Sequence, residues 1–173
     1  MLVDDFSTDN TAAAARSAGG AQLTIVQPKE HCGAGNARQT ALQHIKTPFG
    51  IWLDADDEFM AGRTARHLEL LKSDQYELVY DCGILIDGAT NASLHTLPIP
   101  DFITHGGKIA RQFERNWLPI TQCSFTTAFA RKIGHDTTFQ AAEDYDFMLR
   151  ALVAGGRYGF ITSPGYRYFH YAT

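Results

Sequence analysis

The first half of the chain alternates short β-rich runs with helix patterns, and this alternation constrains the fold more than any other feature. Glycine pairs or a proline separate successive runs, so the connections are short. Repeated strand–helix units of this kind predict an α/β fold with a mostly parallel, doubly wound sheet flanked by helices. Ligands bind such sheets at the carboxyl ends of the strands. The expected strands are residues 2–3, 23–26, 49–53 and 78–86, and the expected helices are residues 12–18, 33–45 and 63–72.

The second half has a different pattern. Residues 87–107 are rich in glycine, proline, threonine and asparagine, which predicts a long surface loop. Residues 143–154 carry the strongest helix pattern of the chain, because their apolar side chains recur at the i, i+3, i+4, i+7 and i+8 positions. The other expected elements are a helix at residues 108–117 and strands at residues 122–130, 157–161 and 166–171.

Composition excludes several classes of protein. The 173 residues suffice for one domain with a real core, and 45% of them are hydrophobic. A net charge of −4 without any lysine or arginine cluster argues against a nucleic-acid partner. The three cysteines form no CxxC pair, which predicts neither a zinc knuckle nor a disulfide framework and fits a reducing compartment. We expect neither a membrane span nor a secretory signal.

An acidic segment directly follows the expected strand at residues 49–53. Four of its five residues, 54–58, are acids: Asp54, Asp56, Asp57 and Glu58. Carboxylates this close raise one another's pKa unless a cation lies among them. Oxygen ligands at a strand end suit Mg²⁺ or Mn²⁺, which keep coordination positions open for substrate phosphates. A solvated acidic turn explains the segment equally well when it is considered alone.

Four further residues lie at the ends of expected elements. Asp5 ends the first strand, where a carboxylate can accept a base N–H or a ribose hydroxyl. Arg38 lies in the first turn of a glycine-led helix, a position suited to phosphate. Asp144 begins the helix at residues 143–154 and can act as a general base, or can simply balance the helix dipole. His170 is a candidate metal or phosphate ligand, and the alternative is a half-buried structural histidine.

The order of these segments resembles that of the family 2 glycosyltransferases, which have the GT-A fold. The family pattern runs from V-D-D-G-S-T-D through a G-x-x-x-A-R-N-like helix and L-D-A-D-D to an E-D helix that ends in glycine. Two departures are visible, because Phe6 replaces a glycine and Gln39 replaces an asparagine. The matching segments are residues 3–9 (VDDFSTD), 33–38 (GAGNAR), 53–57 (LDADD) and 143–155, in which Glu143-Asp144 precedes Arg150 and Gly155.

The resemblance implies a metal-dependent, inverting transfer of a sugar from a nucleotide-diphosphate sugar to an acceptor hydroxyl. The expected donor is a UDP-sugar. Asp144 would deprotonate that hydroxyl. Asp5 would contact the nucleobase, and the divalent metal, Mg²⁺ or Mn²⁺, would lie on the pyrophosphate. The donor would be held by Asp5, Arg38, Asp54 and Asp56, and the metal by Asp56, Asp57 and His170.

The resemblance also implies a single domain, residues 1–173, with a nucleotide-binding part at about residues 1–86 and an acceptor-side part at about residues 87–173. The acceptor would be a saccharide or a lipid-linked molecule in cell-surface polysaccharide or glycolipid synthesis. We expect a cytoplasmic protein at or near the inner face of the membrane, with peripheral association there. The oligomeric state stays undefined.

The family's usual opening strand and helix have no counterpart in this sequence, which suggests either a version of the domain truncated at its N-terminus or a wrongly assigned gene start. In the family, the opening strand lies between the strands that correspond to residues 2–3 and 49–53. Its loss would leave two strand edges unpaired, so we expect weak donor binding and inefficient turnover. Two alternatives stay open: a non-catalytic nucleotide-sugar-binding remnant, and a GT-A-like nucleotidyltransferase, which would need a glycine-rich opening segment with a basic residue.

Overall fold

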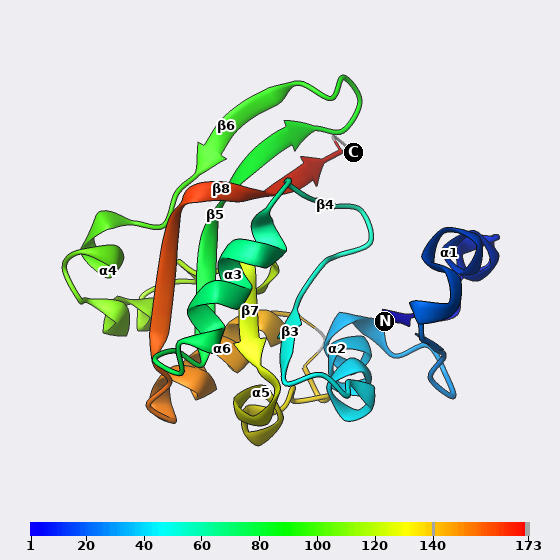
Figure 1. The fold of residues 1–173 in the computed structure, drawn as a ribbon, viewed down its shortest axis with the longest axis horizontal. Coiled ribbons are helices and arrows are strands. Elements are labelled where there is room, and N and C mark those ends of the chain that lie inside the picture. The colour runs from blue at the N-terminus through cyan, green and yellow to red at the C-terminus, as the bar shows by residue number, and fades with distance from the viewer. Residues whose placement is uncertain (140, 172–173) are drawn as a thin grey trace.

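The computed structural model describes residues 1–139 and 141–171, which form two β-sheets and the helices that cover them (Figure 1). The smaller sheet contains the parallel strands β1 and β2, and helix α1 with the 3-10 helix η1 connects them. The bounds of these elements are β1 Leu2–Val3, α1 Thr11–Gly19, η1 Gly20–Gln22 and β2 Ile25–Val26.

The larger sheet has six strands in the order β3-β7-β5-β8-β4, and β6 pairs with β5 beside this path. Its strands are β3 Phe49–Ile51, β4 Glu58–Phe59, β5 Leu78–Asp87, β6 Ser93–Leu97, β7 Cys123–Thr126 and β8 Tyr158–His170. The helices are α2 Gly33–His44, α3 Arg63–Lys72, α4 Asp101–Thr104, α5 Thr127–Ile133 and α6 Glu143–Val153, with the 3-10 helices η2 Ile109–Phe113 and η3 Ile120–Gln122.

The α/β fold with flanking helices is confirmed, but the expectation of a mostly parallel sheet is wrong, because the large sheet is mixed. Strands β3 and β5 follow one another with α3 and the short strand β4 between them, as a strand–helix unit predicts. Strand β7 from the second half lies between them and is antiparallel to both. Within the large sheet, β5 and β8 form the parallel pair. Strand–helix patterns identify segments that are consecutive in the sequence, whereas most neighbouring strands of this sheet are not consecutive; the exception is the antiparallel pair β5 and β6.

Strand β5 pairs with β6, β7 and β8, and its side chains point alternately to the two faces of the large sheet. Leu78, Tyr80 and Cys82 belong to the hydrophobic core beneath α6 and α5. The Tyr80 hydroxyl lies 2.6 Å from the sulfur of Met148 on α6. The opposite face carries Asp81 toward α3. The period of two in a strand therefore separates an apolar layer from a polar one.

Several local expectations for the second half are corrected. The segment at residues 87–107 contains β6 and α4 in addition to loops, and the expected helix at residues 108–117 is the shorter η2. The expected strand at residues 122–130 ends at Thr126, where α5 begins. The two expected C-terminal strands form one strand, β8, with shifts in register around Pro164. Proline lacks an N–H donor and is accommodated at such a bulge.

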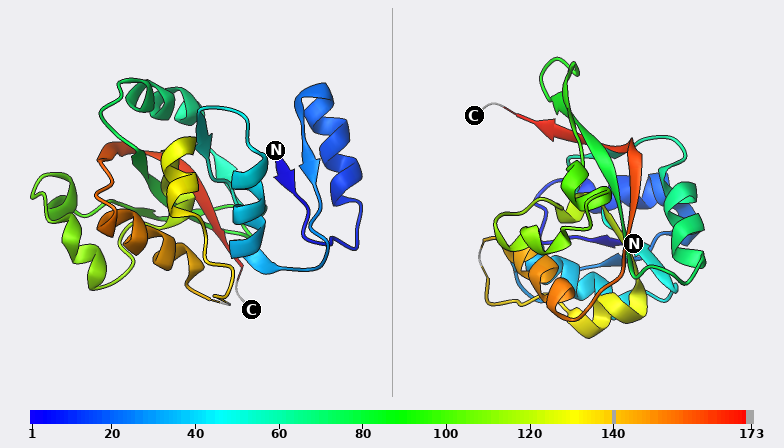
Figure 2. Two further views of the ribbon diagram at one scale, coloured as in Figure 1. Left: turned by 90° about the horizontal axis from the view of Figure 1, so that it is seen from below. Right: turned by 90° about the vertical axis from the view of Figure 1, so that its left-hand side faces the viewer.

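The small sheet lies apart from the large one, as Figure 2 shows at the blue end of the chain. Within the described residues β1 pairs only with β2, and β3 pairs only with β7, so each strand has one unpaired edge. Residues of both strands line a cavity of about 1170 Å³ between the sheets. In the part of the chain that the structure describes, no helix combines the length and apolar character needed to cross a bilayer.

Candidate active site

Side chains from three expected site segments meet in a second cavity of about 470 Å³. These segments are α2, the acidic segment through Asp54, and the first turn of α6. The C-terminal half of β8, residues 119–122 and Leu97 of β6 complete the lining. The structure therefore brings together residues that lie more than a hundred positions apart in the sequence. The titratable side chains that line the cavity are Arg38, Asp54, Glu143, Asp144, Tyr166 and Tyr168.

Arg38 joins two of these elements through its guanidinium group. One nitrogen lies 2.9 Å from the Asp54 carboxylate, and another lies 3.0 Å from that of Glu143. The Arg38 side chain is only 11% exposed, so it is not an ordinary surface arginine. Gly35, one turn earlier on α2, permits this approach, because a Cβ atom there would lie 2.9 Å from Cγ of Glu143. The cavity thus contains a cation held between two acids.

Asp144 is oriented by a chain of side-chain amides. Its Oδ2 accepts a hydrogen bond of 3.0 Å from the Nδ2 of Asn116, and the Oδ1 of Asn116 accepts one of 2.9 Å from Gln112. Gln112 is buried, and its Oε1 accepts a hydrogen bond from the backbone N–H of Trp117. The first turn of α6 adds the positive end of the helix dipole beside the carboxylate. No local sequence signal marks Asn116, because its role depends on contact with a residue 28 positions away.

Asp57 is buried and attached to β8. Its Oδ2 accepts a 2.6 Å hydrogen bond from the Tyr166 hydroxyl, and its Oδ1 accepts one of 2.9 Å from the backbone N–H of Phe169. Burial raises the pKa of Asp57, the two hydrogen bonds oppose this rise, and the neighbouring carboxylates of Asp56 and Asp54 add to it. Both oxygens of Asp57 therefore already have partners within the chain.

Asp56 is the exposed member of the three aspartates, which leaves it accessible to a cation. Among residues 1–139 and 141–171, no three His, Cys, Asp or Glu side chains are grouped to hold a metal ion by themselves. Mg²⁺ commonly uses one or two carboxylates and takes its other ligands from substrate phosphates and water, so the acidic segment fits such an open site. His170 is exposed at the end of β8, opposite Asp87 on β5.

Asp5 lies outside this cavity and caps the beginning of α2. Its two oxygens accept the backbone N–H groups of Cys32 and Gly33 at 2.9 and 2.8 Å, and His31 Nδ1 lies 2.9 Å away. Burial works to raise the pKa of Asp5, but the hydrogen bonds from Cys32 and Gly33 and the charge of His31 outweigh it, and the pKa is lowered. The carboxylate stabilises the N-terminus of α2 as an anion.

This geometry predicts a pH-dependent contribution of Asp5 to folding. Because its pKa is lower in the folded chain than in the unfolded one, the contribution is complete above the unfolded pKa of about 4. It is lost as the pH falls through the lowered folded value. We expect Asp5→Asn to be less stable than the wild type at about pH 6, and the difference to shrink below about pH 4. Urea unfolding of both proteins across this range measures it, and a constant difference would contradict the assignment.

The structure combines a mixed α/β sheet, a carboxylate segment after β3 and an oriented carboxylate at the start of α6. The chain belongs to the glycosyl transferase family 2, whose family model matches residues 1–136. The family named on the sequence pattern is thereby confirmed. The match ends before α6, so Asp144 lies outside it.

Two curated relatives come from Rhizobium meliloti (strain 1021). The succinoglycan biosynthesis protein ExoU is 32% identical over an alignment of 180 positions, which covers 96% of this chain and 52% of ExoU. The succinoglycan biosynthesis protein ExoO is 26% identical over an alignment of 187 positions, which covers 97% of this chain and 51% of ExoO. The chain therefore spans about half the length of the curated relatives it matches.

Solved structures of TarS from S. aureus share the fold. The structure of TarS residues 1–349 in complex with UDP-GlcNAc superposes with a TM-score of 0.78 and 16% identity, and the match covers 99% of this chain and 49% of that one. The complex of the same protein with UDP gives a TM-score of 0.75 at 16% identity and covers 97% of this chain and 50% of that one. At this identity, the likeness establishes the fold.

Proposed function

We propose that this chain transfers a sugar from a UDP-sugar to an acceptor hydroxyl with inversion, in the synthesis of a cell-surface polysaccharide or glycolipid. The observation that carries the proposal is the meeting of Arg38, Asp54 and Asp144 in one cavity. The relatives ExoU and ExoO are named for succinoglycan biosynthesis, and TarS is solved with UDP-GlcNAc, which supports a UDP-sugar donor and a saccharide acceptor.

The chemistry follows from where the charges lie. Inversion by a single displacement needs a base on the side of the sugar opposite the leaving diphosphate. Asp144 is assigned this role, because Asn116 holds its carboxylate and the cavity reaches it. Asp54 and Arg38 mark the donor side, with Asp54 assigned to the ribose. Asp5 is assigned to the nucleobase. In this role its carboxylate would accept a hydrogen bond from the base in addition to those from the backbone N–H groups of Cys32 and Gly33 at the start of α2.

The acidic segment is assigned to the metal. Asp56 would hold Mg²⁺ or Mn²⁺ on the diphosphate, and His170 is a further candidate ligand. Asp57, the third residue of the expected metal set, already has partners for both of its oxygens. The ion, when bound, stabilises the negative charge of the departing diphosphate. The acceptor is assigned to the side of the cavity formed by residues 87–173, where Leu97 and Pro119 join Tyr168 in its lining.

Removal of the metal is expected to abolish UDP binding. Because the diphosphate and the carboxylates of the acidic segment are both negative, they repel one another without a cation between them. We expect calorimetry to detect binding of UDP in the presence of Mn²⁺ and none after addition of EDTA. Guanosine diphosphate is the comparison that tests base selectivity.

A matched pair of variants tests the assignment of Asp56. Asp56→Asn is expected to weaken Mn²⁺-dependent UDP binding at least about tenfold, the range seen when groups that support a metal site are removed. Asp101→Asn removes another exposed acid, in the first turn of α4, and is expected to leave binding unchanged. Binding of UDP that persists in EDTA would contradict the metal assignment. Binding without transfer would favour a non-catalytic module.

A further inference from the structure

Tyr166 connects the core of the protein to the acidic segment. The residue is fully buried on β8, yet its hydroxyl donates to the Asp57 carboxylate at 2.6 Å and accepts the backbone N–H of Asp54 at 3.3 Å. The second oxygen of Asp57 accepts the N–H of Phe169 on the same strand. Three hydrogen bonds therefore connect the acidic segment to β8, one through the backbone N–H of Asp54 and two through the carboxylate of Asp57.

The ring of Tyr166 is itself held in place by a buried ion pair. The guanidinium of Arg63 lies 4.7 Å from the centre of the Tyr166 ring and 4.5 Å from that of Phe59. Arg63 forms two hydrogen bonds with the Asp81 carboxylate, at 2.8 and 3.0 Å, and a third of 3.0 Å with the carbonyl oxygen of Thr121. Neither charged side chain of the pair is exposed. The ring cannot move without disturbing a buried charge.

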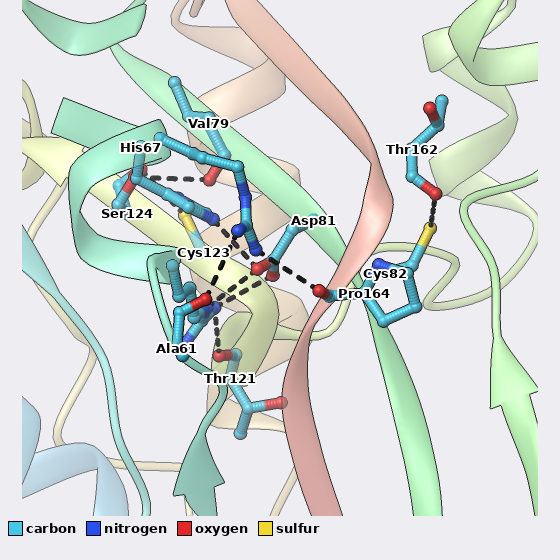
Figure 3. Close-up of polar contacts among 12 residues, drawn as sticks. Ala61, His67, Val79, Asp81, Cys82, Thr121, Cys123, Ser124, Thr162 and Pro164 are labelled. Atoms are coloured by element: carbon cyan, nitrogen blue, oxygen red, sulfur yellow. Dashed lines mark hydrogen bonds and ion pairs between the residues drawn. The ribbon is translucent and has the colours of Figure 1, made fainter. Parts of the chain in front are cut away.

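Further contacts make this arrangement rigid, and Figure 3 shows them between α3, β5 and β7. His67 Nε2 lies 3.0 Å from the Asp81 carboxylate, and His67 Nδ1 lies 2.7 Å from the Ser124 hydroxyl. Gly165 lies directly before Tyr166, and a Cβ atom there would lie 1.8 Å from Oδ2 of Asp81. A glycine at this position therefore lets β8 pass over the ion pair and places the Tyr166 ring against Arg63.

We propose that Tyr166 is a positioning residue, which together with Asp57 sets the orientation of Asp54 and Asp56 toward the donor. This inference rests on the proposed function of the cavity, which Tyr166 and Asp54 both line. In this arrangement Asp57 acts through the backbone of the acidic segment and not as a ligand, because both of its oxygens are occupied. The strand after α6 thereby determines the geometry of the donor side.

Tyr166→Phe tests the proposal, because it removes the hydroxyl and keeps the ring that contacts Arg63 and Phe59. We expect the amide protons of Asp54 and Phe169 to exchange with solvent at least about tenfold faster, as local hydrogen bonds are lost. Metal-dependent UDP affinity is expected to fall at least about tenfold, the scale of lost support for a metal site. Tyr158→Phe is the matched control, because Tyr158 lies eight residues earlier on β8 and stacks on Tyr80.

The readouts separate this proposal from the proposed function. Hydrogen exchange, followed by NMR, needs no ligand, so unchanged exchange at Asp54 and Phe169 in Tyr166→Phe overturns the positioning role even if UDP binds. Faster exchange in a protein that binds no UDP supports the positioning role and counts against the function. Asp57→Asn is expected to match Tyr166→Phe. Loss of metal-dependent binding in Asp57→Asn alone, with normal binding in Tyr166→Phe, would identify Asp57 as a metal ligand and overturn the proposal.

Discussion

Asp81→Asn is expected to lower the free energy of unfolding by about 3–5 kcal/mol, because it leaves the charge of Arg63 buried without its partner. Both side chains are fully buried, and two hydrogen bonds join them. The other close polar contacts of the pair are His67 Nε2, 3.0 Å from the Asp81 carboxylate, and the Thr121 carbonyl oxygen, 3.0 Å from the Arg63 guanidinium, and neither supplies a second negative charge. Urea denaturation followed by circular dichroism measures the loss, and a change below about 1 kcal/mol would show that the pair is not coupled to folding.

Two further variants identify the cause. The double variant Arg63→Met/Asp81→Leu removes both charges, and we expect it to be more stable than Asp81→Asn, because no uncompensated charge remains. Glu114→Gln breaks the ion pair between Arg111 and Glu114, which is exposed, and is expected to leave stability nearly unchanged. A double variant as unstable as Asp81→Asn would attribute the loss to packing and not to charge.

Asp144→Asn is expected to slow sugar transfer by about 10²–10⁴-fold, the usual contribution of a general base. The replacement keeps the shape of the side chain but cannot accept the proton of the acceptor hydroxyl. UDP affinity is expected to stay within about twofold of the wild type, because the base contacts the acceptor and not the donor. Transfer is best measured in single turnovers with the protein in excess over a labelled donor.

The control for this variant is Asp101→Asn, which alters another first-turn acid that is exposed and lies outside the cavity. We expect its transfer rate to equal that of the wild type. If Asp144→Asn binds UDP much more weakly and transfers at a normal rate once donor is saturating, then Asp144 contributes to donor binding and the base must be sought elsewhere. Glu143, which pairs with Arg38 in the same cavity, would be the next candidate.

Helices were the part of the fold that local sequence predicted best. Helix α3 has the predicted bounds, and α6 differs from its prediction by one residue. Helical periodicity and end signals act within a few residues, so they can be read without knowing the rest of the chain. The sheet was predicted less well, because β7 and β8 pair with residues of β5 that lie 43 or more positions earlier, and no local pattern records such partners.

The order of the acidic and basic segments brought together only part of the expected site. Arg38, Asp54 and Asp144 lie in one cavity, whereas Asp56 and Asp57 line the larger cavity, and Asp5 and His170 lie elsewhere, at the start of α2 and the end of β8. The strand expected at residues 166–171 puts Tyr166 and Tyr168 on one face, because side chains two residues apart in a strand point the same way, and both line the cavity. What alternation could not show is that the Tyr166 hydroxyl hydrogen-bonds to Asp57, 109 positions earlier.

The sequence by itself determined the family of this protein and the residue types available for its chemistry, because charge, helix periodicity and strand-end position are properties of short segments. Only the tertiary structure decided how the acids differ from one another. Asp54 is paired with Arg38, Asp57 is buried against Tyr166, and Asp56 is exposed, although all three stand within four positions. Burial and hydrogen bonding depend on distant segments of the chain, and these set the charge and accessibility of each carboxylate.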